Sequence, residues 1–127
     1  YGNMTYAGIK SLIYCGVKAD SPELKAAWKW IKNNYTVTEM PGGKGMQGYY
    51  YYAVAMAKAF TAAGIKELDL PDGKKANWAK DLSRNLISLQ SADGSFANKD
   101  PRWMETDSVL ATAYALQSLN LCVEALP

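Results

Sequence analysis

Two groups of side chains in this sequence have the type and spacing to take part in chemistry. Glu105 and Asp107 stand just before the apolar run 109–119, and four consecutive tyrosines occupy positions 49–52. Acidic side chains at the start of a helix cap free backbone N–H groups and meet the positive end of the helix dipole. A carboxyl group that its neighbours make strongly acidic can instead donate a proton into an apolar cavity.

The tyrosines also allow two interpretations. At 100° per residue, Tyr49, Tyr50, Tyr51 and Tyr52 cover every side of a helix, so at least one of them faces any cavity beside it. Further tyrosines, in two other apolar segments, would add to such a lining; they are Tyr6, Tyr14 and Tyr114. Aromatic faces attract cations, whereas buried tyrosines usually fill a core and bond their hydroxyls locally.

The segments that position these residues read as five helices of two kinds. Segments 22–35 and 78–90 are amphipathic, which predicts helices with one face in water. Segments 4–15, 48–63 and 107–119 are apolar on nearly every side, which predicts burial on nearly every side. The predicted order along the chain is therefore inner, outer, inner, outer, inner.

Internal similarity supports this alternation. Residues 10–16 and 58–64 both run from a lysine to a glycine suited to a helix C-cap, and residues 116–120 are a weaker third copy. We therefore expect an all-α fold in which residues 1–127 form one domain of α/α hairpin repeats, an arc of an α/α toroid. Two and a half hairpins leave apolar faces bare at both ends. The remaining repeats of a larger protein, or another chain, are expected to cover them.

Composition and charge exclude several classes of partner. A formal charge of +2, spread without long runs of one sign, gives no electrostatic footprint for nucleic acid. No run approaches the ~20 apolar residues of a transmembrane segment. Cys15 and Cys122 each lie in an apolar helical pattern, where a free thiol is commoner than a disulfide. The compartment stays unassigned.

One turn carries a family resemblance. The stretch Leu86–Phe96, with Gln90 before Asp93, Gly94 and an aromatic residue, resembles the glutamine-aromatic repeat of the squalene-hopene cyclase and prenyltransferase-like superfamily. In that family the glutamine ties the end of an outer helix to the next turn, and the aromatic ring seals one hairpin to its neighbour. The resemblance implies a terpenoid cyclase-like α/α toroid and an apolar, isoprenoid ligand.

The branches of this superfamily imply different sites. The zinc branch is excluded because the chain has no histidine, and no metal or cofactor is expected. In the class II terpene cyclase branch, Asp107 takes the place of the proton donor and Glu105 that of its supporting carboxyl. Ser108 replaces the third carboxyl of that motif, and no histidine is present to support the acid.

Two functions therefore remain open from the sequence. The first is a terpene cyclase-like domain that holds an isoprenoid against Tyr6, Tyr114 and the tyrosines at 49–52, with Asp107 and Glu105 as candidate catalytic residues. The second is a non-enzymatic repeat module for protein–protein interaction, with the acids as caps and the tyrosines as core. The glycine-rich loop 40–48 offers Lys44 and backbone N–H groups to a phosphate, but it lacks the phosphate-loop ending, and the sequence favours a linker over a phosphate site.

Overall fold

The chain folds into five helices and one short β-hairpin, and the computed structural model describes residues 1–127. The elements in order are α1 (Gly2–Tyr14), α2 (Pro22–Asn33), α3 (Tyr49–Ala63), β1 (Glu67–Asp69), β2 (Lys75–Asn77), α4 (Trp78–Leu89), the 3-10 turn η1 (Arg102–Met104) and α5 (Ser108–Ala125). The two strands pair antiparallel, with Leu68 opposite Ala76. The fold is mostly helical as predicted, and the hairpin is an addition to the expected all-α class.

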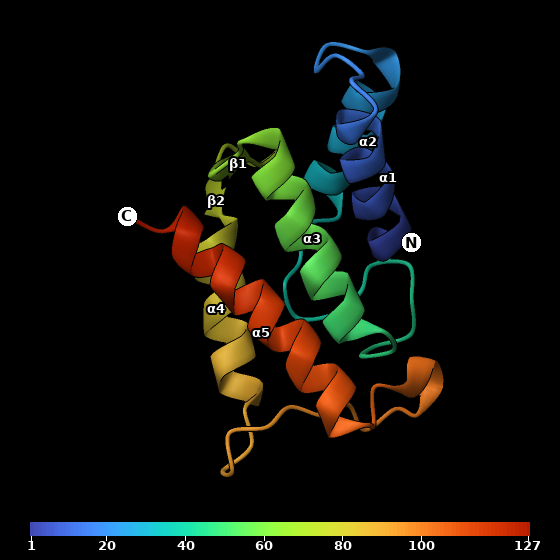
Figure 1. The fold of residues 1–127 in the computed structure, drawn as a ribbon. Coiled ribbons are helices and arrows are strands. Elements are labelled where there is room, and N and C mark those ends of the chain that lie inside the picture. The colour runs from blue at the N-terminus through green and yellow to red at the C-terminus, as the bar shows by residue number, and fades with distance from the viewer.

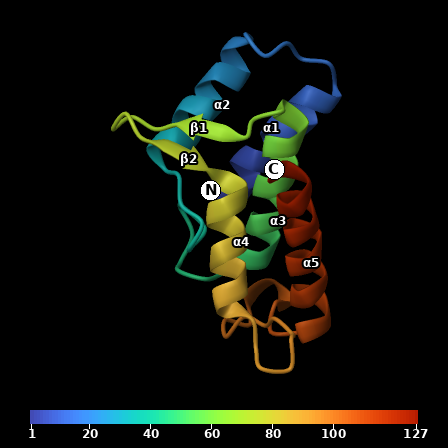
Figure 2. The same cartoon turned by 90° about the vertical axis from the view of Figure 1, so that its left-hand side faces the viewer.

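The helices lie in two layers (Figures 1 and 2). One layer holds α1, α3 and α5 side by side, with α3 in the middle, and all three run in the same direction. The second layer holds α2 and α4, which run the opposite way, so each connects two neighbours of the first layer. The chain therefore alternates between the two layers, and we call α1, α3 and α5 the inner helices and α2 and α4 the outer helices. No helix has the length and apolar character needed to cross a membrane.

Local signals in the sequence explain where the helices begin and end. Ser21 caps α2 by accepting a hydrogen bond from the Leu24 N–H at 3.2 Å, with Pro22 at the first helical position. Asn77 caps α4 in the same way through the Lys80 N–H at 3.0 Å. Gly64 ends α3 with φ +66°, a left-handed conformation that glycine adopts without steric cost.

Only the middle helix is buried on nearly all sides. Ten of the fifteen residues of α3 are buried. The expectation of all-round burial was wrong for α1 and α5, whose exposed residues include Met4, Tyr14, Val109, Leu116 and Val123. These two helices end the row, so each has an inner neighbour on one side only. Position in the row, and not composition, decides their burial.

Aromatic packing joins the two layers at Phe60 of α3. The Trp78 ring of α4 stacks on Phe60 with centroids 5.4 Å apart and an interplanar angle of 8°. Trp28 of α2 lies against the same ring, also at 5.4 Å. The Trp78 indole donates to the Ile65 carbonyl at 2.7 Å, so its polar group is satisfied. Both outer helices therefore insert a tryptophan against one phenylalanine.

Buried tyrosine hydroxyls tie the segment 34–37 to the core. Tyr52 donates to the Thr36 carbonyl at 2.6 Å, and Tyr49 donates to the Val37 carbonyl at 2.5 Å. Tyr35 donates to a carboxylate oxygen of Asp81 on α4 at 2.8 Å. Removal from water raises the pKa of Tyr35, Tyr49 and Tyr52, and of Tyr6 beside them, far above the usual value for tyrosine.

These tyrosines predict a loss of stability in alkali. Their pKa values are raised in the folded chain, so their contribution is complete below about pH 10, the pKa of an unfolded tyrosine, and falls as the pH rises above it. Each tyrosine that ionises only when unfolded lowers the free energy of unfolding by roughly 1.4 kcal/mol per pH unit. Urea unfolding between pH 8 and 11.5, followed by circular dichroism, measures the slope of the free energy of unfolding against pH.

Tyr52→Phe should make this slope shallower, whereas Tyr14→Phe, at an exposed position, should leave it unchanged. Burial also raises the pKa of the Cys122 thiol to about 11, so the series is best run in a Cys122→Ala background. Equal slopes for all the variants would contradict the assignment to buried tyrosines.

Candidate functional site

An aromatic pocket of about 330 Å³ opens where the N-terminal ends of the three inner helices meet. Its lining residues are Asn3, Met4, Gly48, Tyr51, Trp103, Glu105 and Tyr114. The Tyr51 and Tyr114 rings meet edge to face, with centroids 5.9 Å apart at 64°. All three inner helices and the η1 turn contribute, so the pocket exists only in the folded chain.

Helical geometry divides the four consecutive tyrosines between core and pocket. Tyr51 is 39% exposed and lines the pocket, whereas Tyr49, Tyr50 and Tyr52 are at most 1% exposed and belong to the core. Tyr6 also lies in the core, against Tyr52 and Phe60. Among the six tyrosines expected to bind a ligand, Tyr51 and Tyr114 are therefore the two that reach this pocket.

Glu105 caps α3, although it lies more than fifty residues further along the chain. It is 1% exposed, and its two carboxylate oxygens accept hydrogen bonds from the backbone N–H groups of Tyr50 and Tyr51 at 2.9 and 3.0 Å. The residue before α3 is Gly48, which has no side chain to cap the helix itself. A buried carboxylate thus stabilises free N–H groups and the positive end of the α3 dipole.

Asn98 holds Glu105 in this position. Its backbone N–H donates to the Glu105 carbonyl at 2.8 Å, and its side-chain amide lies 3.3 Å from a Glu105 carboxylate oxygen. The same amide also donates to the Met46 carbonyl in the loop before α3. Asn98 therefore clamps the segment that precedes α5 onto the N-terminus of α3.

Asp107 lies in a different environment from Glu105. Its side chain is exposed and accepts a hydrogen bond from the Val109 N–H at 2.9 Å, which makes it the N-cap of α5. It is not among the residues that line the aromatic pocket. The structure therefore places both candidate acids at helix N-termini, one in the core beside the pocket and the other at the surface.

The η1 turn holds Trp103 over the pocket in a strained backbone conformation. Trp103 and Met104 have φ values of +68° and +64°, in the left-handed region that non-glycine residues avoid. Their side chains are 60% and 70% exposed, so burial of these two residues does not offset the strain. A Cβ atom at Gly48 would lie 3.3 Å from the Trp103 ring, so the glycine lets the indole approach α3.

Side-chain and backbone contacts hold the turn between α4 and α5. The Gln90 amide donates to the Gly94 carbonyl at 2.9 Å, which closes the turn after α4. Phe96 is buried and packs against Tyr50, with ring centroids 6.0 Å apart. The Phe96 N–H donates to the Thr112 hydroxyl of α5 at 3.0 Å. The turn thereby fixes the segment that carries Asn98, Trp103 and Glu105.

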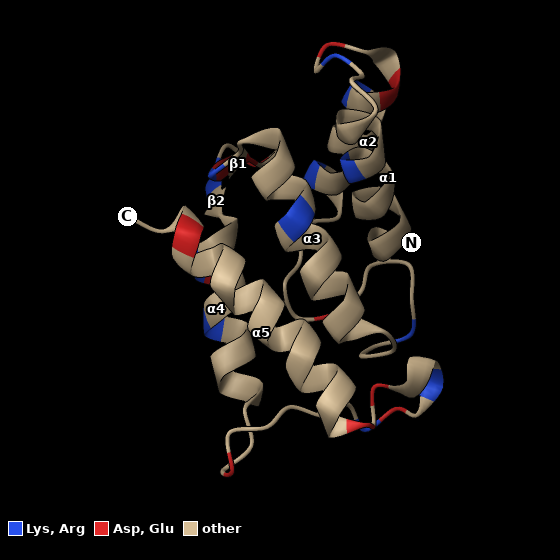
Figure 3. Cartoon of the chain, viewed as in Figure 1, with Lys and Arg blue, Asp and Glu red and all other residues tan.

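A second pocket, of about 670 Å³, adjoins the aromatic one, and we call it the basic pocket. Its charged lining residues are Lys44, from the glycine-rich loop, and Arg102, from η1; the others are Tyr1, Asn3, Met4, Met40, Gly42, Gly43, Gln47 and Trp103. In Figure 3 the basic positions of this loop and of the η1 turn lie on the same side of the molecule.

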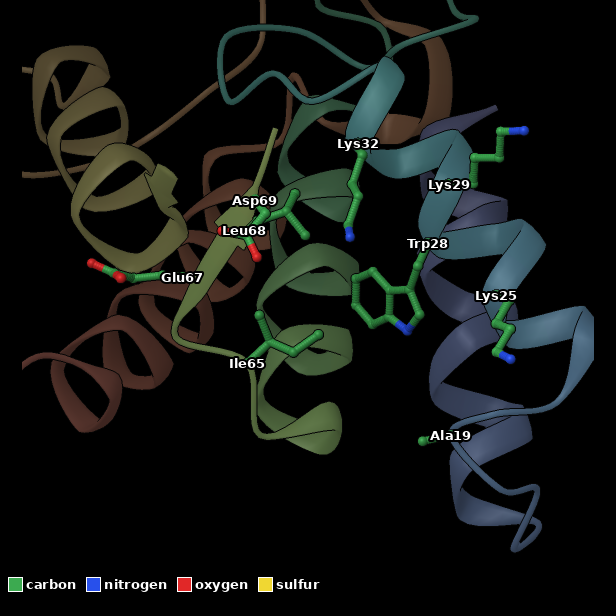
Figure 4. Close-up of a pocket in the computed structure, with 9 residues that line it drawn as sticks. All are labelled: Ala19, Lys25, Trp28, Lys29, Lys32, Ile65, Glu67, Leu68 and Asp69. Atoms are coloured by element: carbon green, nitrogen blue, oxygen red, sulfur yellow. The ribbon is translucent and has the colours of Figure 1, made fainter. Parts of the chain in front are cut away.

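A third hollow, of about 490 Å³, lies between α2 and the hairpin and shares no lining residue with the other two pockets (Figure 4). Trp28 and Lys32 point from α2 toward the hairpin, whereas Lys29 points away. Asp69 on the opposite wall pairs with Lys75 at 3.7 Å. Lysines and carboxylates both line this hollow, so it does not favour a ligand of one charge.

Two further observations concern the metal-ligating side chains and the thiols. No group of three His, Cys, Asp or Glu side chains is placed to hold a metal ion. Cys15 is exposed and Cys122 is buried, and both are free thiols.

Comparison of the chain with protein families, with curated proteins and with solved structures finds no match. The arguments for a function therefore rest on the geometry of the pockets.

Sequence reasoning missed part of the aromatic pocket. Met4 and Asn3 lie in an ordinary apolar helical pattern, and nothing in that pattern marks them as lining residues. Trp103 also lines the pocket, although it is largely exposed. The position of Trp103 depends on its positive φ, and no pattern of composition or spacing predicts a positive φ at a tryptophan.

The two acids are predicted to differ in their effect on stability. Glu105→Ala should lower the free energy of unfolding by about 2–3 kcal/mol, because two buried N–H groups lose a charged acceptor. Asp107→Asn should change it little, since asparagine caps a helix as well as aspartate does. Urea unfolding of both variants at pH 7 measures the difference, and similar values for the two would contradict the assigned roles.

Proposed function

We propose that this chain is an arc of an α/α toroid that binds an apolar small molecule, of the size and character of an isoprenoid, in the aromatic pocket. The observation that carries the proposal is the convergence of all three inner helices on one pocket lined by Met4, Tyr51, Trp103 and Tyr114. A volume of about 330 Å³ lies at the lower end of the range for small-molecule sites. The edge-to-face tyrosine pair provides two aromatic rings, inclined at 64°, as part of the apolar wall.

The strained turn supports the same proposal. Backbone strain of order 1–3 kcal/mol per residue persists only where surrounding contacts impose it, and such residues cluster at ligand sites. Here Trp103 and Met104 carry the strain, and Asn98 and Glu105 anchor the segment on either side. A turn held in this way keeps the indole at the mouth of the pocket before a ligand arrives.

The proposed role is binding without proton transfer. A class II cyclase acid needs an apolar surrounding in which a carbocation escapes water. Asp107 is exposed and caps its own helix, α5. Both carboxylate oxygens of Glu105 accept hydrogen bonds from backbone N–H groups of α3. These contacts favour the capping interpretation of both carboxyl groups over the catalytic one.

Binding is tested by calorimetric titration with farnesol, an uncharged isoprenoid alcohol. Tyr51→Ala and Tyr114→Ala should each weaken binding about tenfold or more, because each removes an aromatic wall. Tyr14→Ala, an exposed tyrosine outside the pocket, is the matched control, and Asp107→Asn should bind like the unaltered chain. Absence of farnesol binding, or equal loss in the Tyr14 control, would overturn the proposal.

A second candidate function, a protein-interaction module, is favoured by one surface of α5. Val109, Leu116 and Val123 are 78%, 54% and 72% exposed and recur every seven residues, so they form one apolar ridge along the helix. The only charged residue of α5 is Glu124, near its end, and the helix is almost free of charge in Figure 3. Such a ridge suits another apolar helix, from further repeats or from another chain.

If the ridge mediates association, the native mass should rise above the 13.9 kDa of the monomer as the concentration increases. Leu116→Glu should restore the monomer mass, because it places a charge in the centre of the ridge. Ile87→Glu, at an exposed apolar position on α4, is the control. Light scattering after size exclusion gives the masses, and a monomer at every concentration would argue against self-association through α5.

A further inference from the structure

We infer that the ligand of the aromatic pocket carries an anionic head group, a carboxylate or a phosphate, which the adjoining basic pocket binds. This inference rests on the proposed function, and it adds the chemical class of the ligand: a single-chain amphiphile with a negatively charged end. The apolar chain occupies the aromatic pocket, and the head lies between the glycine-rich loop and the η1 turn.

The two pockets adjoin. Asn3, Met4 and Trp103 line both of them, so only these three residues lie between the tyrosine pair and the basic side chains. A ligand that fills the smaller pocket and extends past Met4 and Trp103 reaches the larger one directly. Polarity changes along this path, from aromatic rings at one end to cations and amides at the other.

The basic pocket has a charge of one sign. Lys44 and Arg102 are its charged lining side chains, and no Asp or Glu lines it. Neither cation takes part in an ion pair, since the only two in the structure join Lys74 to Asp72 and Lys75 to Asp69. Two unpaired cations around one pocket attract an anion more strongly than either does alone.

The two carboxylates that flank Arg102 in the sequence already accept hydrogen bonds. Glu105 lines the aromatic pocket, but its oxygens accept from the Tyr50 and Tyr51 N–H groups and do not neutralise Lys44 or Arg102. Asp100 accepts a hydrogen bond from the Arg102 backbone N–H at 2.9 Å, and it is absent from the lining. An incoming anion therefore meets no competing carboxylate in the basic pocket.

The arginine is placed at the junction of the two pockets. Its guanidinium carbon lies 4.8 Å from the centre of the Trp103 ring, within the range of a cation–π contact. The same indole forms part of the aromatic pocket, so the cation and the apolar wall are next to each other. The Asn3 and Gln47 amides add donors that suit either a carboxylate or a phosphate.

The test compares four probes with the same ten-carbon chain: decanol, decanoate, decyl phosphate and decyltrimethylammonium. Calorimetry at low salt should give roughly tenfold tighter binding of decanoate than of decanol, since each exposed ion pair contributes up to about fivefold. The advantage should shrink in 0.5 M NaCl, which screens surface charges. The ratio of decyl phosphate to decanoate then identifies which anion the pocket prefers.

Variants separate this inference from the proposed function. Lys44→Gln and Arg102→Gln should each weaken decanoate binding about threefold to fivefold and leave decanol binding unchanged. Lys29→Gln, an exposed lysine on α2, is the control, and thermal unfolding checks that each variant folds.

Equal binding of decanol, decanoate and decyltrimethylammonium, unaffected by either variant, would overturn the anionic head group and leave apolar binding intact. Failure of every probe to bind, decanol included, would overturn the aromatic pocket as a ligand site as well. Loss of decanoate and decanol together in Lys44→Gln would also count against a role for Lys44 in head-group binding.

Discussion

The contact on which the rest of this structure depends is the one between the Glu105 carboxylate and the start of α3. Helix α3 lies in the middle of the inner layer, and its first turn has no side-chain cap of its own because Gly48 precedes it. A buried carboxylate from a distant part of the chain satisfies two of its N–H groups. That single contact fixes the loop before α5 and brings Trp103 beside Tyr51, so the same interaction that stabilises the core also builds the pocket.

The free-energy cost of burying the Glu105 carboxylate is offset by its hydrogen-bond partners. An ionised group without hydrogen bonds would be strongly destabilised there, whereas Glu105 has two backbone donors and the helix dipole. Asn98 and the turn that Gln90 closes after α4 fix the position of Glu105. The segment from the end of α4 to the start of α5 is thus structural along its length, and the strained η1 turn is the part of it that contributes side chains to the pockets.

The two layers distribute apolar surface unevenly, and the candidate interaction surfaces follow from that distribution. Helix α3 buries its surface against neighbours on both sides, while α1 and α5 each keep a free side. At one end of the layer lie the two adjoining pockets. The aromatic pocket is lined by Tyr51 and Tyr114, and the basic pocket is lined by Lys44 and Arg102. Along α5 the free surface is instead a convex ridge. A pocket suits a small molecule, whereas a ridge suits a second helix.

The sequence by itself determined the five helices and their order, because the hydrophobic period acts over a few neighbouring positions. It also indicated a turn after Gln90, which the Gln90 amide closes in the structure. Which of the four tyrosines faces the pocket, which helices are buried, and which helix Glu105 caps were decided only by the tertiary structure. Glu105 shows the reason: local rules assign a carboxylate to the helix that follows it in sequence, but the free N–H groups that it satisfies belong to a helix more than fifty residues earlier, which only the packed chain brings within hydrogen-bond distance.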